Sequence, residues 1–477
     1  MKRSRFPDNN KSLILLGHLS LIITAILAVI FYKERVIYTD PGQQLFEMIN
    51  NNDFRIYANR YSMVINQAIP LLAIKIGLPL KYIAICYSLS FVLIYYLCFL
   101  ISVYGFKNIG AGLGIALAPI LIRTAFGHSI SEAWLGVAYS AVFYALLNYY
   151  HQWKSKGTNY KIFFFALIGI VIVINFYIHA ITLFTLVFSV GFTYFYKKQG
   201  KEPYIYIVGI LVILPYVLKF LFPDHVHDQS FFEGIKMAPQ LLPKLSDLPI
   251  FKFILSEFFG LYFLAAILIV WACISYARKT NLAPFLFSFL FIGIYIVIAC
   301  LTFYKTEPQY SMESRLIPSV FMIVVTFIEI KINKKTNYAA FAIISLILIF
   351  SYVDLYKQVR SHHTTRIKLY EKILDKTSAY PERKFYIYYT NEQPLPVNSW
   401  GSAAETLLLS SLNGKENSKS IVFVSSTTPV DKGLNYWPCV FIWVPWYMFY
   451  PEERINKKYF DLKCTEYREL PYSMIEK

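Results

Sequence analysis

Long apolar runs follow one another from residue 12 to residue 353, separated by shorter polar stretches. A helix needs about 20 mostly apolar residues to cross a bilayer, because each backbone N–H and C=O must find a partner within the segment where water is absent. About eleven runs approach or reach that length, near 12–32, 81–103, 109–122, 134–150, 162–177, 179–196, 204–222, 253–276, 282–303, 316–330 and 338–353. The pattern predicts an all-α polytopic membrane protein with about 11 transmembrane helices.

The pattern changes after residue 353. Apolar side chains fall at helical spacing as far as about residue 376, and shorter runs follow. Those runs are strand-like at 385–389, 421–424 and 439–444, and helical at 403–412. We therefore expect a transmembrane domain over 1–353 and a small α/β domain over 354–477, which is long enough for a core of its own.

A segment of mixed polarity at 33–80 separates the first two apolar runs. On a helical wheel, residues 54–68 divide into an apolar face and a polar face. The apolar face carries Phe54, Tyr57, Tyr61, Val64, Ile65 and Ala68, and the polar face carries Arg55, Asn59, Ser62 and Asn66. This division predicts an amphipathic helix that lies flat on the outer leaflet, preceded by a second short helix at 43–49.

The composition agrees with this fold class. Of the 477 residues, 56% are hydrophobic and only 16% are charged, which is far too apolar for an ordinary soluble domain. The run at 12–32 has a basic front, as a secretory signal does. Its apolar part exceeds a signal core and no small-residue cleavage site follows, so we expect it to be retained as a span.

The net charge of +17 is distributed unevenly along the chain. If the amino terminus is cytoplasmic, the inner segments carry sixteen basic residues against three acids; the basic residues are Lys2, Arg3, Arg5, Lys11, Lys107, Lys154, Lys156, Lys161, Lys197, Lys198, Lys201, Arg278, Lys279, Lys331, Lys334 and Lys335. By the positive-inside rule the amino terminus lies inside, and an odd number of spans places the C-terminal domain outside. The basic excess is therefore topological, and we expect no nucleic-acid partner.

The six cysteines divide between the two domains. Four lie in predicted spans, where cysteine acts as a small apolar side chain: Cys86, Cys98, Cys273 and Cys300. Cys439 and Cys464 form the remaining pair, in the outer domain. A disulfide between them is one interpretation, suited to an oxidising compartment, and two buried thiols are the other.

Ionisable side chains are scarce inside the predicted spans, where His18 and Glu257 are the main ones. A proton-coupled transporter or pump normally needs more acids at mid-membrane, so the sequence disfavours transport. The chain also lacks the G-x-S-x-G elbow, the H-E-x-x-H zinc motif, the kinase motifs and a phosphate-binding loop.

The stretch YTDPGQQ places Asp40 directly after the first span, at a bend made by Pro41 and Gly42. Carboxylates are common at such turns because they accept hydrogen bonds from backbone N–H groups, and this local role is one interpretation of Asp40.

The overall plan of the chain suggests another interpretation, because the chain resembles the GT-C superfamily of integral-membrane glycosyltransferases. The shared features are an inside amino terminus, an acid after span one, interfacial helices in the first outer loop, around a dozen spans and an external C-terminal domain. Some members have paired acids at this position, whereas the nearest other acids here are Glu34, Glu47 and Asp53.

The resemblance implies transfer of a sugar from a polyprenyl-phosphate carrier to a lipid, glycan or protein acceptor on the extracytoplasmic face. Asp40 would take or orient the proton of the acceptor hydroxyl. Cations at the outer ends of the spans would bind the leaving phosphate. The candidates for phosphate or substrate binding are Arg55, Arg60, Arg123, His128, His179, Lys305, Tyr310 and Arg315. Snorkelling or simple solvation is the structural alternative for each of them.

Two further segments carry weaker signals. Residues 223–228, PDHVHD, contain side chains of the types that bind divalent metals, and a solvated loop is the simpler interpretation; the side chains are Asp224, His225, His227 and Asp228. Residues 435–453 concentrate aromatic rings, which stack on sugars but more often fill a core or anchor a segment at a bilayer surface; these include Trp437, Trp443, Trp446, Tyr447 and Tyr450.

We therefore expect a bacterial inner-membrane protein with a periplasmic C-terminal domain, in contact with membrane lipids. The function expected first is glycosyl transfer, with dependence on a divalent cation left open. The alternatives are a polymerase, ligase or translocase of lipid-linked glycans, and a non-enzymatic membrane subunit whose outer domain binds a partner.

Overall fold

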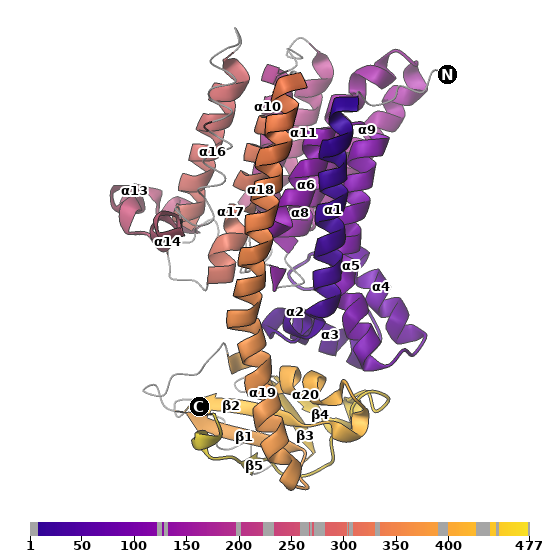
Figure 1. Cartoon of the computed structure of the whole chain (residues 1–477), viewed down its shortest axis with the longest axis vertical. Coiled ribbons are helices and arrows are strands. Elements are labelled where there is room, and N and C mark those ends of the chain that lie inside the picture. The colour runs from indigo at the N-terminus through magenta and orange to yellow at the C-terminus, as the bar shows by residue number, and fades with distance from the viewer. Residues whose placement is uncertain are drawn as a thin grey trace.

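A bundle of long helices and a smaller strand-containing domain make up the molecule (Figure 1). The computed structural model describes residues 8–121, 126–127, 132–196, 202–222, 233–257, 267, 270, 282–302, 304, 309–329, 334–389, 399–425, 439–444 and 448–475. The chain starts at one end of the bundle, and the smaller domain lies beyond the other end.

The bundle and its short outer helices contain the following elements: α1 (Asp8–Ile30), α2 (Tyr32–Val36), α3 (Thr39–Asn51), α4 (Val64–Lys75), α5 (Leu80–Leu100), α6 (Ile109–Leu121), α8 (Glu132–Lys154), α9 (Thr158–Phe176), α10 (Thr182–Tyr196), α11 (Pro203–Leu221), α13 (Ala238–Leu241), α14 (Pro249–Glu257), α16 (Ala283–Thr302), α17 (Gln309–Glu329) and α18 (Lys334–Gln358).

Within the described part of the chain, six helices are long and apolar enough to cross a membrane: Asn10–Ile30, Leu80–Gly105, Thr158–Phe176, Pro203–Leu221, Ala283–Thr302 and Ala340–Ala379. α6 and α10 are shorter apolar helices. The chain is thus a helical membrane protein. The number of eleven spans stays a prediction, and much of the run predicted at 253–276 lies outside the described residues.

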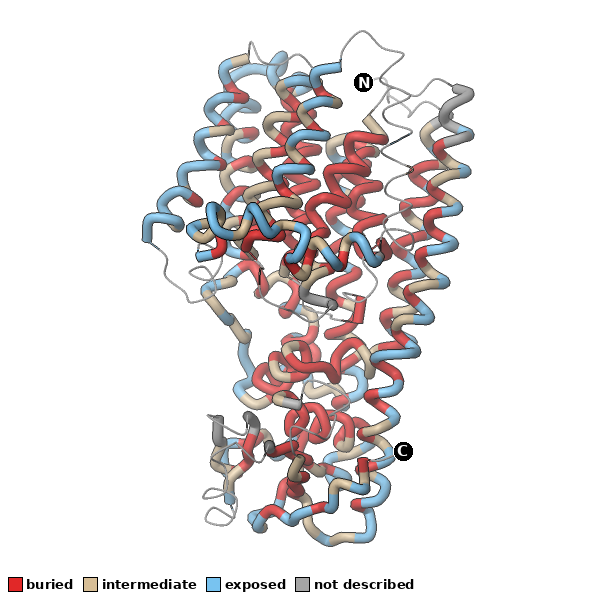
Figure 2. The backbone as a smooth tube through the Cα atoms, turned by 90° about the vertical axis from the view of Figure 1, so that its left-hand side faces the viewer, coloured by how far each residue is buried: buried red, intermediate tan, exposed pale blue. Residues whose placement is uncertain are grey.

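The centre of the bundle is α6, which is buried from Gly110 to Leu121 and packs against α1, α5, α8 and α17. Two of its glycines lie against bulky neighbours. A Cβ added at Gly112 would lie 2.3 Å from Val103 Cγ2, and one at Gly114 would lie 2.8 Å from Phe321 Cδ2. Small residues allow this close approach of helices. Figure 2 shows the buried residues gathered in the middle of the bundle, with exposed positions along its outer helices.

The single amphipathic helix predicted over 54–68 is wrong. Residues 52–60 lie outside any helix, and helix α4 begins only at Val64, after a 3-10 turn at Tyr61–Met63. The backbone is left-handed at Asn52, Ala58 and Asn59, with φ of 52°, 51° and 57°. A right-handed helix contains no residues with positive φ, and the spacing of apolar side chains along the sequence gives no sign of them.

The non-helical segment is held in place by a side chain from α4. Gln67 Oε1 accepts the backbone N–H of Arg55 at 2.8 Å, and Gln67 Nε2 donates to the carbonyl of Arg55 at 2.8 Å. The shorter helix predicted at 43–49 is present within α3. Most of α3 is buried, and it packs against a helix of the C-terminal domain, α20 (Ser402–Ser411).

The last membrane helix runs directly into the C-terminal domain. α18 continues through a π-helical turn, Val359–Thr364, into α19 (Thr365–Lys376), so the helix predicted after residue 353 is an extension of the last span. π-Helical turns inserted in α-helices are frequent at functional sites. This one faces the segment between α2 and α3, where the ring of Tyr38 lies edge-on to that of His363 at 4.9 Å.

The strands predicted in the C-terminal domain are confirmed. β1 (Lys384–Tyr389) pairs in parallel with β2 (Ser420–Ser425) and with β5 (Arg468–Glu469), while β3 (Val440–Val444) and β4 (Met448–Pro451) form an antiparallel pair. Parallel neighbours need a crossover, and α20 supplies it between β1 and β2. Cys439 and Cys464 are joined in a disulfide, the pairing that the sequence left open.

Candidate functional site

Asp40 lies in the first turn of α3, where the helical bundle meets the C-terminal domain. Pro41 suits the first turn of a helix because its missing N–H has no partner there in any case. Gly42 allows a close approach, since a Cβ at that position would lie 3.3 Å from Val36 O and 3.5 Å from Glu405 Cγ. The DPG stretch therefore starts a helix pressed against its neighbours, and its aspartate is half-buried.

Tyr87 links Asp40 electrostatically to a second carboxylate, that of Glu132. The Asp40 and Glu132 carboxylates both lie within electrostatic range of the Tyr87 hydroxyl, which donates a 2.7 Å hydrogen bond to Gln44 Oε1. Glu132, at the first residue of α8, forms an ion pair with Arg60 at 2.7 Å. The site thus combines two acids, a cation and a phenol from four separate segments of the chain.

The sequence did not single out Tyr87, Gln44 or Glu132. Glu132 is an acid at the outer end of a predicted span, and this position was the one signal that could have identified it. Tyr87 is one tyrosine among 39 in the chain and has no motif around it. Its proximity to Asp40 depends on how α5 packs beside the bundle's outer end, which no local pattern encodes.

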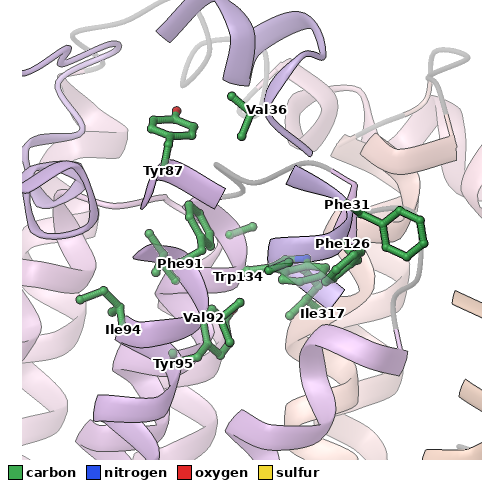
Figure 3. Close-up of a cluster of buried hydrophobic side chains, with 14 of the residues drawn as sticks. Phe31, Val36, Tyr87, Phe91, Val92, Ile94, Tyr95, Phe126, Trp134 and Ile317 are labelled. Atoms are coloured by element: carbon green, nitrogen blue, oxygen red, sulfur yellow. The ribbon is translucent and has the colours of Figure 1, made fainter. Parts of the chain in front are cut away.

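A pocket lies between α1, α2, α5, α6 and α8 and contains about 260 Å³ of empty space, counted with the part open to solvent. Arg35 of α2 lines it, and its guanidinium donates to Ser88 Oγ at 2.8 Å and to the carbonyl of Phe126, over whose ring it stacks at 4.2 Å. Figure 3 shows Trp134 beside Phe126, with Tyr95 of α5 close to them.

Two polar atoms of this pocket's lining are buried without a hydrogen bond in the described structure, Trp134 Nε1 and Tyr95 Oη. A buried polar atom without a partner costs about 1–3 kcal/mol, so such atoms usually meet a water or a ligand. Together with Arg35, the pocket presents hydrogen-bond donors on mostly apolar walls. Its chemistry and size suit a single water molecule.

The predicted phosphate-binding residues do not form one cluster around Asp40 in the described structure. Arg60 reaches the site through Glu132. Arg55 instead forms an ion pair with the buried Glu47. His179 Nε2 and Arg315 Nη1 lie 3.0 Å apart, and Arg315 supplies the positive charge of this second group.

The His179–Arg315 group is connected to the first outer loop. The ring of Tyr61 lies edge-on to that of Tyr177 at 5.4 Å, and Ser62 Oγ donates to the carbonyl of Ile174 at 2.7 Å. The group therefore shares the outer level of the bundle with Asp40. Arg123, His128 and Lys305, and the side chain of Tyr310, lie outside the described residues.

The structure adds little support for the weaker candidates, the possible metal ligands and the aromatic stretch. The candidate metal ligands lie outside the described residues; they are Asp224, His225, His227 and Asp228. Among the residues that are described, no three His, Cys, Asp or Glu side chains are placed to hold a metal ion. Of the aromatic stretch at 435–453, Tyr450 is half-buried and lies edge-on to Phe46 at 6.1 Å, which is a core contact. The side chains of Trp437, Trp443, Trp446 and Tyr447 are outside the described part.

A buried carboxylate from the C-terminal domain adjoins Asp40. Glu405 accepts the backbone N–H of Thr39, the guanidinium of Arg366 and, at 2.7 Å, the hydroxyl of Tyr370. The guanidinium of Arg366 stacks over the ring of Tyr38 at 4.9 Å. Burial raises the pKa of Tyr38 to about 12, so this phenol stays neutral near pH 7.

In comparisons with known proteins, no family model, no curated protein and no solved structure matches the chain.

Proposed function

We propose that the protein is a membrane glycosyltransferase that moves a sugar from a polyprenyl-phosphate carrier to a lipid, glycan or protein acceptor. The observation that carries the proposal is the position of Asp40. It is a half-buried carboxylate at the start of α3, beside Glu405 of the C-terminal domain and within electrostatic range of Tyr87, on which Glu132 also acts.

The chemistry uses Asp40 as general base. The acceptor hydroxyl loses its proton to the Asp40 carboxylate, its oxygen forms a bond to the anomeric carbon of the sugar, and the bond from that carbon to the carrier phosphate breaks. The leaving phosphate takes the electron pair of that bond and keeps its lipid tail in the bilayer. Cations at the same level, Arg60 and Arg315, stabilise the charge that develops on it, with His179 beside Arg315.

The orientation that we propose places the C-terminal domain in the periplasm of a bacterial inner membrane. The domain lies at the end of the bundle opposite the start of α1, whose preceding residues are basic. Positive residues favour the cytoplasmic side. The disulfide between Cys439 and Cys464 suits an oxidising compartment, which supports the same assignment.

The test compares Asp40→Asn with Asp53→Asn. Asp53 lies in the same outer loop, but it is exposed, and within the described structure its side chain accepts one hydrogen bond, from the neighbouring Phe54 N–H at 2.7 Å. Purified protein in lipid nanodiscs is given the lipid-linked sugars that accumulate in cells lacking it, and release of the carrier phosphate is measured. We expect Asp40→Asn to slow release by about 100-fold or more and Asp53→Asn to leave it unchanged.

Equal rates for Asp40→Asn and the wild type would refute the role of Asp40. Chelation of divalent cations in the same assay decides whether a metal takes part. If cells lacking the protein keep their single-sugar decorations but show glycans of altered length, a polymerase or ligase is the better assignment.

A further inference from the structure

Glu405 is far from Asp40 in sequence but next to it in space, and it is fully buried together with its partner Arg366. We propose that Glu405 is a positioning residue, through which the C-terminal domain and the last membrane helix fix the turn that carries Asp40. The proposal rests on the proposed function for its catalytic meaning. The mechanical part, the fixing of the first turn of α3, stands on the contacts alone.

The first step of the argument is the contact of Glu405 with α3. Its carboxylate accepts the backbone N–H of Thr39, the first residue of the helix. The N–H groups in the first turn of a helix have no partner inside the helix, and the helix dipole favours a negative charge there. Glu405 therefore caps α3 from another domain, and Asp40 is the next residue along the chain.

The second step is that the turn would not hold this shape by itself. Thr39 has a φ of 20°, a backbone conformation that side-chain-bearing residues rarely adopt, and Tyr38, the residue before the helix, makes no side-chain cap. Strained residues of this kind persist only when their surroundings hold them. The surroundings here include Glu405 and Gly401, since a Cβ at Gly401 would lie 3.1 Å from Thr39 Cα.

The third step is that the partners of Glu405 belong to the extension of the last membrane helix. Arg366 and Tyr370, which donate to it, lie on α19, the extension of the last membrane helix. The same helical extension contacts α2 as well, where Thr364 Oγ1 donates to Glu34 Oε1 at 2.9 Å. A tilt of the last helix or of the C-terminal domain would therefore displace the first turn of α3.

The experiment compares Glu405→Gln with Glu452→Gln in the full-length protein in nanodiscs. Glu452 is also buried and also pairs with a buried cation, Lys384, but within the C-terminal domain. Each variant leaves a buried cation without its carboxylate, so both should lower the melting temperature. Amide hydrogen exchange is followed in a peptide covering residues 38–46.

We expect exchange in that peptide to quicken about tenfold or more in Glu405→Gln, the effect of weakening a hydrogen bond to a charged group, and to stay at the wild-type rate in Glu452→Gln. In the transfer assay, kcat should fall in Glu405→Gln with an unchanged KM for the lipid-linked sugar. Equal exchange in the two variants would overturn the proposal.

If Glu405→Gln does not fold, the same exchange measurement is made on Tyr370→Phe. This variant removes one hydrogen bond to Glu405 and keeps the aromatic ring. It should quicken exchange in residues 38–46 by a smaller factor, and an unchanged rate would overturn the proposal. If exchange changes as expected while Asp40→Asn transfers sugar normally, Glu405 positions the turn but the proposed function is wrong.

Discussion

Two buried ion pairs in this molecule have similar chemistry but different surroundings. Lys384–Glu452 connects two parts of the C-terminal domain, and Lys384 Nζ also donates to the carbonyl of Val440 at 3.2 Å. Arg366–Glu405 connects α19 with α20 and, through the second carboxylate oxygen, with the backbone of α3. The first pair is internal to a domain, whereas the second joins the domain to the turn that carries Asp40.

The difference shows what a buried ion pair can be used for. Taking two charges out of water costs free energy that their attraction often fails to recover, so neither pair is evidence of high stability. Burial lowers the pKa of Lys384 and raises that of Glu452, which means that the protein environment disfavours both charged forms. The pair at the junction has an additional effect, because its carboxylate orients a third element.

The largest expected effect comes from breaking the internal pair. Glu452→Leu leaves the Lys384 ammonium buried without its carboxylate and should cost about 3–5 kcal/mol of stability, whereas the double variant Lys384→Met with Glu452→Leu should recover most of it. Thermal unfolding of the purified protein in detergent measures both. Transfer activity of the double variant should match the wild type.

The corresponding double variant at the junction, Arg366→Met with Glu405→Leu, sharpens the comparison. It should also recover stability relative to Glu405→Leu alone, but it removes the carboxylate that accepts the Thr39 N–H. Transfer should therefore stay impaired. Full activity in this variant would mean that the two pairs are equivalent and that the junction has no special role.

A smaller effect is expected from a methyl group placed at the junction. In Gly401→Ala the new Cβ would lie 2.8 Å from Glu405 Oε1 and 3.1 Å from Thr39 Cα, so the Glu405 carboxylate must move and the Thr39 backbone must give way slightly. Overpacking of this kind costs about 1–3 kcal/mol. The control is Gly169→Ala in α9, where a Cβ would meet no atom within 4 Å. Because alanine is favoured over glycine in a helix, that control should be neutral or stabilising.

The sequence predicted those parts of the molecule whose pattern is local. Apolar runs identified the helices of the bundle, and the short runs at 385–389 and 421–424 identified two strands, since both depend on which side chains are buried in a repeating structure. The wheel at 54–68 failed because left-handed residues such as Ala58 and Asn59 interrupt the helix without changing the periodicity of apolar side chains.

The candidate site was predictable only in part. Asp40 was visible from the chain because it follows the first span beside a proline and a glycine. Its neighbours were not visible, because Tyr87 and Glu405 come from distant segments and lie in stretches with no motif of their own. Long-range contacts of this kind depend on the packing of whole helices, and a single sequence contains no pattern that reports them.

The smallest expected effect is the pH dependence that the internal pair contributes. Burial raises the pKa of Glu452, so between its ordinary and its raised pKa the folded chain holds a proton that the unfolded chain has released. Because the folded state binds more protons in this interval, the free energy of unfolding falls as the pH rises through it.

Glu452→Gln should remove this slope, while Glu453→Gln, at the exposed neighbouring residue, should leave it in place. Melting temperatures of the three proteins across the acidic range measure the slope. A slope that survives in Glu452→Gln would show that the surroundings of the Lys384–Glu452 pair do not disfavour its charged forms. The contrast between the two ion pairs would then depend only on the contact of Glu405 with Thr39.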